Sequence, residues 1–333
     1  MKAKDIRILF LAHYAPKDLS SQLPTDIEDV VYAEYHYKIY RVLMELFPNT
    51  ISSNDPSVLL KTNVPTDYIF TLYNRMPFKN SEVFVSSVAE YHKIPYLGAR
   101  PNIRALAEDK HLAKMMARYA GVVTPEWQIY NIGGIINPPE FAQPYFCKPR
   151  FGAASKGIDE GSACSTWVVA KERIERLHQQ GYDVILEKQI LGTYHTSPVL
   201  NNFGDNLFLP CIAQHSVLKN GIVTYEQKRK IVSGLTREIV SDPNLELLLM
   251  NNSQKMFPLI QPLDYTRFDY IVEEHTGIPY FLEFNVCCNL GEHSTVSQAA
   301  AHIGIGYKEL IANILYSSMY RQGLLNDTCG KKF

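Results

Sequence analysis

Two polar motifs near the C-terminal end carry residue types that suit a divalent metal. The first, Thr-Arg-Phe-Asp-Tyr, contains Arg267 and Asp269, and the second, Tyr-Phe-Leu-Glu-Phe-Asn, contains Glu283 and Asn285. If they form a hairpin, alternation puts the polar side chains of each strand on one face and the Phe and Leu residues on the other. Pairing then brings Asp269, Glu283 and Asn285 together. Carboxylate and amide oxygens suit Mg²⁺. The alternative, an exposed polar face, leaves this convergence unexplained.

Two lysines stand where they can meet a phosphate. Lys148 ends the apolar segment Tyr-Phe-Cys-Lys-Pro, and the small-residue loop 152–157 follows it, whereas Lys110 lies on a predicted helix. A lysine supplies the counter-charge for a phosphate, and the amides of such a loop supply unobstructed donors. The loop does not follow the order of a Walker motif. Taken alone, Lys148 also fits a solvated strand end.

The elements that must position these residues alternate in type. Patterns of apolar residues, caps and breakers predict a strand at 6–12, a helix at 27–47, a strand at 67–72 and a helix at 81–92 with Ser81 as its N-cap. This order implies a small parallel α/β domain. A helix at 104–120, ended by Gly121, follows. Later strands are expected at 145–149, 184–188, 207–218, 268–273 and 279–285, and later helices at 296–303 and 307–321.

The length of the chain and these patterns suggest several units. For 333 residues we expect an N-terminal α/β substrate domain at 1–100, a central subdomain at 101–190, a C-terminal catalytic domain at 191–325 and a frayed tail at 326–333.

Composition excludes several classes of protein. Thirty-three Lys and Arg against 34 Asp and Glu leave a net charge of −1, whereas a general nucleic-acid binder carries a basic excess. No apolar run is long enough to span a bilayer. The basic and then apolar start faintly resembles a secretory signal, but a first buried strand fits better. Six cysteines without a CxxC pair favour reduced thiols in a cytoplasmic protein.

The order of these motifs resembles the ATP-grasp superfamily, and within it the D-alanine–D-alanine ligases. The resemblance runs from about residue 94 to 321 and includes Lys110, Lys148, the apolar strand that contains Glu187, Lys228 and the polar hairpin. It implies an α/β (α+β) ATP-grasp fold: a small parallel N-terminal α/β domain, a central α+β subdomain and a C-terminal α+β domain, with the nucleotide between the last two. Each motif alone is loose, whereas the ordered set is specific.

The resemblance implies that one group of residues binds ATP. Lys110 and Lys148 would hold phosphates, and Lys228, on a loop, would reach the γ-phosphate. Glu187 would accept a hydrogen bond from the adenine amino group. The full nucleotide-binding set is Lys110, Lys148, Ser155, Glu187, Lys188, Ile190 and Lys228.

A second group implied by the resemblance binds metal and the other substrates. Arg267 would stabilise the oxyanion of a tetrahedral intermediate, with a backbone donor from Asn289. Ser294, beside His293, would bind the carboxylate of the acceptor. The expected metal ligands are Asp269, Glu283 and Asn285, which would hold two Mg²⁺ ions.

Several positions depart from the family pattern. The family glutamate that holds the amine of the first alanine is absent, since residues 11–16 read Leu-Ala-His-Tyr-Ala-Pro. Its serine and tyrosine partners are replaced by Ala154 and Arg229, and the ribose-binding glutamate by Tyr194. These losses imply a donor without a bound α-amine. Arg75 and Arg229 are the candidates for binding its carboxylate, because an arginine fork grips a planar anion bidentately.

The resulting prediction is an ATP-dependent carboxylate–amine ligase of the acid–amino acid type. A small carboxylic acid would become an acyl phosphate, and an amino acid or similar amine would attack it to form an amide. Nucleic acid and membrane are not expected partners, and a homodimer is left open. An intramolecular cyclase is the alternative among enzymes. A catalytically silent nucleotide-binding subunit fits poorly with intact metal and phosphate residues, and a thiol nucleophile at Cys287 or Cys288 lacks a matching His and Asp.

Overall fold

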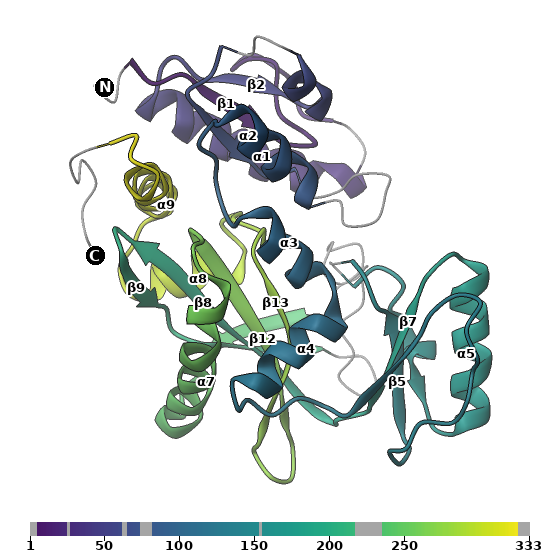
Figure 1. Ribbon diagram of the computed structural model, residues 1–333. Helices are drawn as coiled ribbons and strands as arrows, with labels where there is room; N and C mark the ends of the chain where they lie inside the picture. Colours follow the sequence, from purple (N-terminus) through teal and green to yellow (C-terminus); the bar gives the residue numbers. More distant parts are fainter. Residues whose placement is uncertain are drawn as a thin grey trace.

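Three β-sheets organise the part of the chain that the structure describes. The structure is a computed structural model that describes residues 5–24, 27–61, 65–73, 82–152, 155–216 and 235–325. Figure 1 shows the first sheet and its helices at the top, a second sheet with α5 to one side, and the third sheet between and below them. Within the described residues, no helix is both long and apolar enough to cross a membrane.

The first sheet is small and parallel. Its order is β2-β1-β3, with β1 (Ile8–Leu11) between β2 (Ile51–Ser53) and β3 (Tyr68–Thr71). All four residues of β1 are buried, so the apolar run Ile-Leu-Phe-Leu forms its centre. The connection from β1 to β2 contains α1 (Ile27–Leu46), that from β2 to β3 contains a short 3-10 helix, and α2 (Val83–His92) follows β3. Glu82 precedes α2 without a side-chain cap bond, and the expected N-cap, Ser81, lies outside the described residues.

The second sheet is antiparallel and carries Lys148. Its order is β4-β7-β5-β6, and helix α5 packs on the strands. Cys147, Ile174 and Leu186 lie fully buried between helix and sheet. The bounds of these elements are β4 Trp127–Tyr130, β5 Tyr145–Pro149, β6 Ala163–Cys164, α5 Trp167–Gln179 and β7 Val184–Lys188.

The third sheet is the largest. Its order is β11-β10-β8-β12-β13, with β9 paired to β8. The strand expected at 207–218 is two strands, because Pro210 lies between them and cannot donate to a ladder. The bounds are β8 Gly192–Asn202, β9 Asp205–Phe208, β10 Ile212–Ser216, β11 Leu235–Ile239, β12 Tyr265–Glu273 and β13 Pro279–Asn285, with helix α7 at Pro243–Met256.

A bulge interrupts the β12–β13 ladder beside the cavity described below. Asp269 pairs with Glu283, but Tyr270 pairs with Phe281, so Leu282 has no opposite residue. The bulge lets Phe281 enter the core beside Tyr270, with their rings 6.0 Å apart, while Glu283 stays on the other face.

The helix expected at 104–120 is two helices. α3 (Pro101–Glu108) and α4 (Lys110–Tyr119) meet at Asp109, whose backbone is extended. The Asp109 carboxylate accepts from the amide of His111 at 3.0 Å and from Arg150 at 2.9 and 2.7 Å. A capping side chain competes with helix continuation, so the chain starts α4 anew at Lys110. Gly121, at φ +70°, follows α4 as expected.

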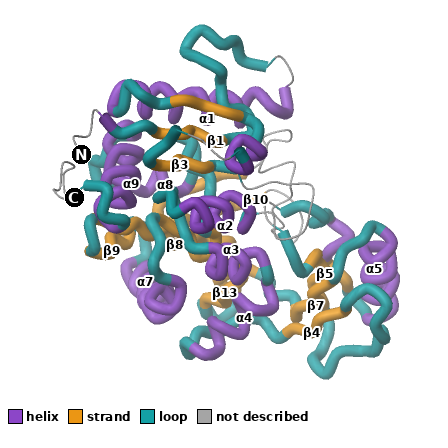
Figure 2. Tube along the Cα trace, turned by 45° about the horizontal axis from the view of Figure 1, so that its top comes forward, coloured by secondary structure: helices purple, strands orange, loops and turns teal. Residues whose placement is uncertain are grey.

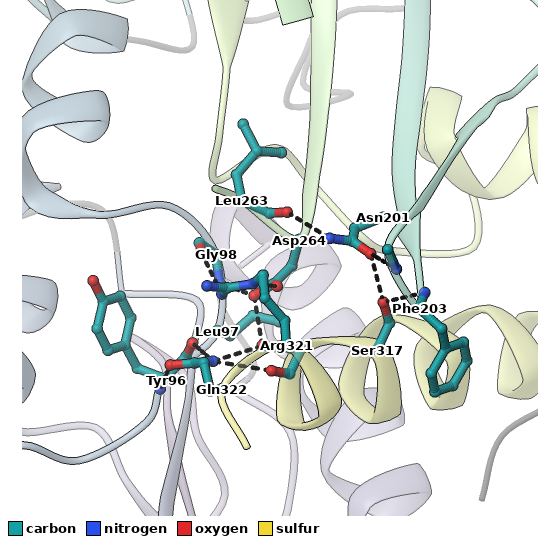
Figure 3. A network of polar contacts seen from close by, with 12 residues as sticks. Tyr96, Leu97, Gly98, Asn201, Phe203, Leu263, Asp264, Ser317, Arg321 and Gln322 are labelled. Atoms are coloured by element: carbon teal, nitrogen blue, oxygen red, sulfur yellow. Dashed lines mark hydrogen bonds and ion pairs between the residues drawn. The ribbon is translucent and has the colours of Figure 1, made fainter. Parts of the chain in front are cut away.

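The last two helices join the first sheet to the third. α8 (Thr295–His302) and α9 (Tyr307–Arg321) share a core with α1 and β1, and Figure 2 shows α8 and α9 beside β3. A buried polar network strengthens this junction (Figure 3). Asp264, fully buried, accepts from the amide of Gly98 at 2.6 Å, from Ser318 Oγ at 2.6 Å and from Arg321 Nε at 2.8 Å.

Candidate active site

A cavity of about 270 Å³ lies where the three sheets approach one another. The first sheet contributes the loop after β1, the second sheet contributes Lys148, and the third contributes the polar hairpin. A smaller cavity of about 30 Å³ adjoins it at the end of β7. Most residues singled out from the sequence, though far apart in the chain, line these two spaces.

The polar hairpin has the pairing expected from the sequence. Asp269 lies opposite Glu283, and Arg267 lies opposite Asn285. Arg267 donates from Nε and Nη2 to the two oxygens of Asp269, both at 2.8 Å. Asn285 Nδ2 donates to Asp269 at 3.0 Å. Burial opposes the charge of Arg267, but the Asp269 carboxylate outweighs it and raises the pKa of the guanidinium.

Leu282 lies elsewhere than alternation predicts. It was expected on the face opposite Glu283, but it lines both cavities because the bulge removes it from the alternation.

The donor set of this hairpin fits Mg²⁺. Asp269, Glu283 and Asn285 offer carboxylate and amide oxygens at one wall of the cavity, and these are hard ligands. Among the described residues no cluster of three His, Cys, Asp or Glu side chains forms a metal site. A magnesium ion here would take its remaining ligands from phosphate and water, as this ion usually does.

Lys110 and Lys148, the two lysines expected to bind phosphate, are buried and line the cavity. Lys110 Nζ donates to the carbonyl of Gly152 at 2.7 Å and lies 3.9 Å from Glu283 Oε2. Lys148 Nζ lies 3.0 Å from Glu187 Oε2. Ser155, in the small-residue loop, is 8% exposed and has a positive φ of 60°. Gly152, Ser155 and Lys156 of this loop line the cavity, whereas residues 153–154 lie outside the described residues.

A third lysine, for which the sequence predicted no role, lies beside the same glutamate as Lys148. Lys114 is fully buried, with its Nζ 3.1 Å from Glu187 Oε1 and bonded to Thr124 Oγ1 at 2.9 Å. Burial lowers the pKa of Lys114 to about 8, although the Glu187 charge opposes this shift. Its position one helical turn after Lys110 was the available signal.

The smaller cavity has a mixed apolar and polar lining. Phe146, Ile190 and Leu282 line it with Lys188 and Tyr194. Glu187 Oε1 forms an ion pair with Lys114, but it lacks a partner in hydrogen-bond geometry. Glu187 is one of the residues that line this cavity. Burial, followed by the charge of Glu187, raises the pKa of Tyr194.

The residues expected to bind the acceptor lie in and just before the N-terminus of α8. Ser294 is the N-cap of α8 and accepts from the amide of Ser297 at 3.1 Å. Asn289 Oδ1 accepts from the amide of Gly291 at 2.6 Å, and His293 lines the same wall. The expected donor arginines, Arg75 and Arg229, and the γ-phosphate lysine, Lys228, lie outside the described residues.

Sequence patterns did not predict two further features of the cavity. One is a wall of aromatic and imidazole rings from the loop after β1 and from helix α1: His13, Tyr14, Tyr32, Tyr35 and His36. The other is Arg237 on β11. Arg237 shares the more buried face of β11 with Leu235 and Ile239, whereas Thr236 and Glu238 lie on the exposed face.

The two adjacent thiols are unsuited to nucleophilic attack. Burial raises the pKa of Cys287 to about 11 and that of Cys288 to about 12. Because the thiolate is the reactive form, both thiols are inert near neutral pH.

A cavity bordered by three sheets, with buried lysines and a carboxylate–amide hairpin, holds the groups that an ATP-dependent ligase needs to activate a carboxylate. Comparison with known proteins identifies the family. The model "D-ala D-ala ligase C-terminus" matches residues 119–316. The chain is 31% identical over 247 residues to the D-alanine–D-alanine ligase of Clostridium beijerinckii, covering 71% of this chain and 76% of that protein. It is 27% identical over 239 residues to that of Aquifex aeolicus, covering 69% and 76%.

Solved structures show the same fold. The D-alanine–D-alanine ligase from Bacillus anthracis complexed with ATP matches with a TM-score of 0.73 at 19% identity, covering 96% of this chain and 99% of that one. The VanG D-Ala:D-Ser ligase from Enterococcus faecalis matches with a TM-score of 0.68 at 15% identity, covering 94% and 99%. The chain belongs to the D-alanine–D-alanine ligase family of ATP-grasp enzymes. The expected mixed α/β fold and ATP-dependent C–N ligase class are confirmed.

Proposed function

We propose that this ligase joins a carboxylic acid other than D-alanine to an amino acid or similar amine. The donor carboxylate attacks the γ-phosphorus of ATP, and the neutral amine then attacks the acyl phosphate and expels phosphate. Relatives of the chain are D-alanine–D-alanine ligases by name, which supports the reaction class. Holding both partners in line supplies much of the rate acceleration.

The nucleotide half of this proposal assigns the two cavities. The adenine ring would occupy the smaller cavity, between Phe146 and Leu282, with its amino group donating to Glu187. The phosphates would extend toward Lys110 and Lys148, whose charges offset theirs. The backbone of Lys188 and Ile190 would flank the ring, and Ser155 would donate from the phosphate loop.

The metal and oxyanion residues act at the other end of the nucleotide. Asp269, Glu283 and Asn285 would hold Mg²⁺, with two ions as the finer proposal, and the metal would neutralise charge that develops on the transferred phosphoryl group. Arg267, fixed by its two bonds to Asp269, would stabilise the oxyanion formed when the amine attacks. Ser294 and His293 would receive the acceptor, and Lys228 would approach the γ-phosphate.

One observation carries the choice of donor: the wall of rings. His13 and Tyr14 lie 4.6 Å apart, Tyr35 and His36 lie 4.6 Å apart, and Tyr14 stacks on His36 at 5.9 Å. The methyl group of alanine is too small to cover this aromatic surface. None of these side chains is a carboxylate that could pair with an α-ammonium group. The remaining lining carboxylate of this region, Glu82, acts on the buried guanidinium of Arg104. We therefore expect a larger, flat or hydroxylated acid, with Arg75 and Arg229 as its carboxylate partners.

The test compares D-alanine with a pool of acids. Purified protein with ATP, Mg²⁺ and D-alanine alone should release no ADP above background. Pools of carboxylic acids and amines should release ADP and yield an amide identified by mass. A product equal to one substrate less water would identify the cyclase alternative. Robust synthesis of D-alanyl-D-alanine would refute the donor proposal and leave the ligase class intact.

The organisation and location of the enzyme are proposed with its function. Each of the three sheets lies within one of the units 1–100, 101–190 and 191–325, which supports those boundaries. A cytoplasmic location fits the free thiols found among the described residues: Cys147, Cys164, Cys211, Cys287 and Cys288.

A further inference from the structure

Arg237 lies on the catalytic face of the third sheet. It is opposite Gln214 on β10, and Gln214 is opposite Tyr194 on β8. Residues directly opposite one another share a face of a sheet. Tyr194 is two residues from Thr196, which pairs with Asp269, so Arg237 faces the same side as the proposed metal ligands. It lines the larger cavity with them.

Within the described residues, two neutral acceptors hold the guanidinium of Arg237. Its Nε donates to Gln214 Oε1 at 3.3 Å and its Nη1 to the carbonyl of His293 at 3.4 Å. Both contacts are long for N–H···O bonds. Among the described residues no carboxylate forms an ion pair with it, whereas Arg267 is paired with Asp269. Burial and the nearby charge of Arg267 lower the pKa of Arg237, as expected for two cations that face one cavity.

The position of Arg237 points to the acceptor rather than to ATP. Along the third sheet, β11 is at the opposite edge from β13, which carries Glu283. Lys110, on α4, lies 3.9 Å from Glu283 on β13, and Lys148 lines both cavities together with Leu282 of the same strand. The carbonyl that Arg237 contacts belongs to His293, the residue before the N-cap of α8. Arg237 therefore stands beside the acceptor end of the cavity.

We propose that Arg237 binds a second carboxylate on the acceptor, which makes the acceptor an acidic amino acid. This inference rests on the proposed function, in which Ser294 receives the acceptor's first carboxylate. Gln214 orients the guanidinium from the neighbouring strand, so its remaining N–H groups can form a bidentate pair with a carboxylate. A cation in a partly buried site without an anion is costly, and an anionic substrate removes that cost on binding.

Direct binding measurements test this inference. We would titrate the full chain with aspartate and glutamate of both hands, and with asparagine and glutamine of both hands, by calorimetry. Each titration is done with Mg²⁺, in the presence and in the absence of a non-hydrolysable ATP analogue. At least one acid should bind tenfold or more tightly than its own amide, because only the acid supplies the second carboxylate.

Variants assign the preference to one side chain. Arg237→Gln should abolish the preference for acid over amide, and Arg237→Lys should keep only part of it, because lysine retains the charge but not the fork. Arg176→Gln, on the exposed side of α5, removes the same charge elsewhere and should keep the full preference. All three variants should bind the ATP analogue as the unchanged chain does.

The outcomes separate the two proposals. Equal binding of acids and amides by the unchanged chain, or a full preference in Arg237→Gln, would overturn the role of Arg237. If the thermal transition shows that Arg237→Gln is unfolded, a full preference in Arg237→Lys has the same meaning. Failure to bind the ATP analogue would instead count against the proposed function, while the titrations without nucleotide still decide on Arg237.

Discussion

At the scale of single residues, the cavity is built from charges that hold one another in place. Arg267 occupies both oxygens of Asp269, and Lys110 lies near Glu283. A metal ion would have to share Asp269 with Arg267, which leaves Glu283 as the carboxylate with the weaker competitor. The negative charge at Glu283 is therefore central to the proposed metal site.

Removal of that charge should stop the reaction. Glu283→Gln keeps the size of the side chain but removes one anionic ligand, so ADP formation should fall at least a hundredfold, about 2.7 kcal/mol. Circular dichroism should show an unchanged fold. Glu274→Gln, at the exposed end of the same hairpin, is the matched control and should turn over normally. Normal turnover in Glu283→Gln would refute the metal assignment.

Lys114 gives the site a dependence on pH. The pKa of Lys114 is about 8 in the folded chain, mainly because the side chain is buried, and about 10.4 in an unfolded chain. Between these values the unfolded state binds more protons than the folded state. The free energy of unfolding therefore rises with pH across this window, and below about pH 8 the cost of burying the charge is fully present.

A difference measurement isolates this contribution. From pH 7.5 to 9.5 the unfolding free energy of the unchanged chain should rise by about 2 kcal/mol relative to that of Lys114→Met, which does not titrate. Urea unfolding at the two pH values provides both numbers. Parallel pH dependence of the two proteins would show that Lys114 keeps an ordinary pKa.

At the scale of elements, the break at Asp109 determines where Lys110 points. One continuous helix would turn Lys110 with the regular helical period, whereas the extended Asp109 starts α4 beside Phe151 and Arg150. The same carboxylate caps α4 and holds Arg150, the second residue after Lys148. Asp109 thus helps to position both lysines that are proposed to bind phosphate.

Its substitution should affect stability and nucleotide binding together. Asp109→Ala loses the cap and the partner of Arg150 and should cost about 2–4 kcal/mol. Asp109→Asn keeps a capping oxygen and should cost less. Denaturant unfolding measures both losses, and the KM for ATP should rise in the order Asn, then Ala. An unchanged KM in a folded Asp109→Ala would separate the helix break from the site.

Sequence patterns predicted those elements whose local signals agree with their tertiary surroundings. Strands 145–149, 184–188 and 279–285 and helix 307–321 have the expected bounds, because apolar runs and breakers mark both ends. The sequence did not reveal β8, whose mixed residues become buried only through pairing with β10 and β12. It did not reveal α5 or α7 either. The wall of rings and Arg237 depend on the meeting of distant segments, which periodicity does not report.

At the scale of the whole molecule, Asp264 joins the beginning, middle and end of the chain. It receives donors from Gly98, Ser318 and Arg321, and Gln322 adds bonds to both backbone groups of Tyr96 (Figure 3). The first sheet therefore has a fixed polar attachment to α9 as well as an apolar one. Because the loop after β1 and helix α1 supply the ring wall, this attachment also sets the wall's distance from the hairpin.

Loss of this attachment should be severe. Asp264→Ala leaves the guanidinium of Arg321 buried without its partner and should cost about 3–5 kcal/mol of unfolding free energy. Asp67→Ala removes the carboxylate of a more exposed aspartate–arginine pair, with Arg7, and should cost much less. Thermal unfolding compares the two. Equal losses would mean that burial of the Asp264 pair adds nothing to its strength.

The bulge at Leu282 has a consequence for how substrate and metal are spaced. In a regular strand the side chains of two consecutive residues point to opposite faces of the sheet, yet Leu282 and Glu283 both face the cavity. One rigid peptide unit therefore separates the apolar side chain that would contact a ring from the carboxylate that would bind a cation. The distance between these two groups is thus fixed. This spacing fits a ligand with an apolar end and a highly charged end. A ligand whose two ends are spaced differently would bind less tightly.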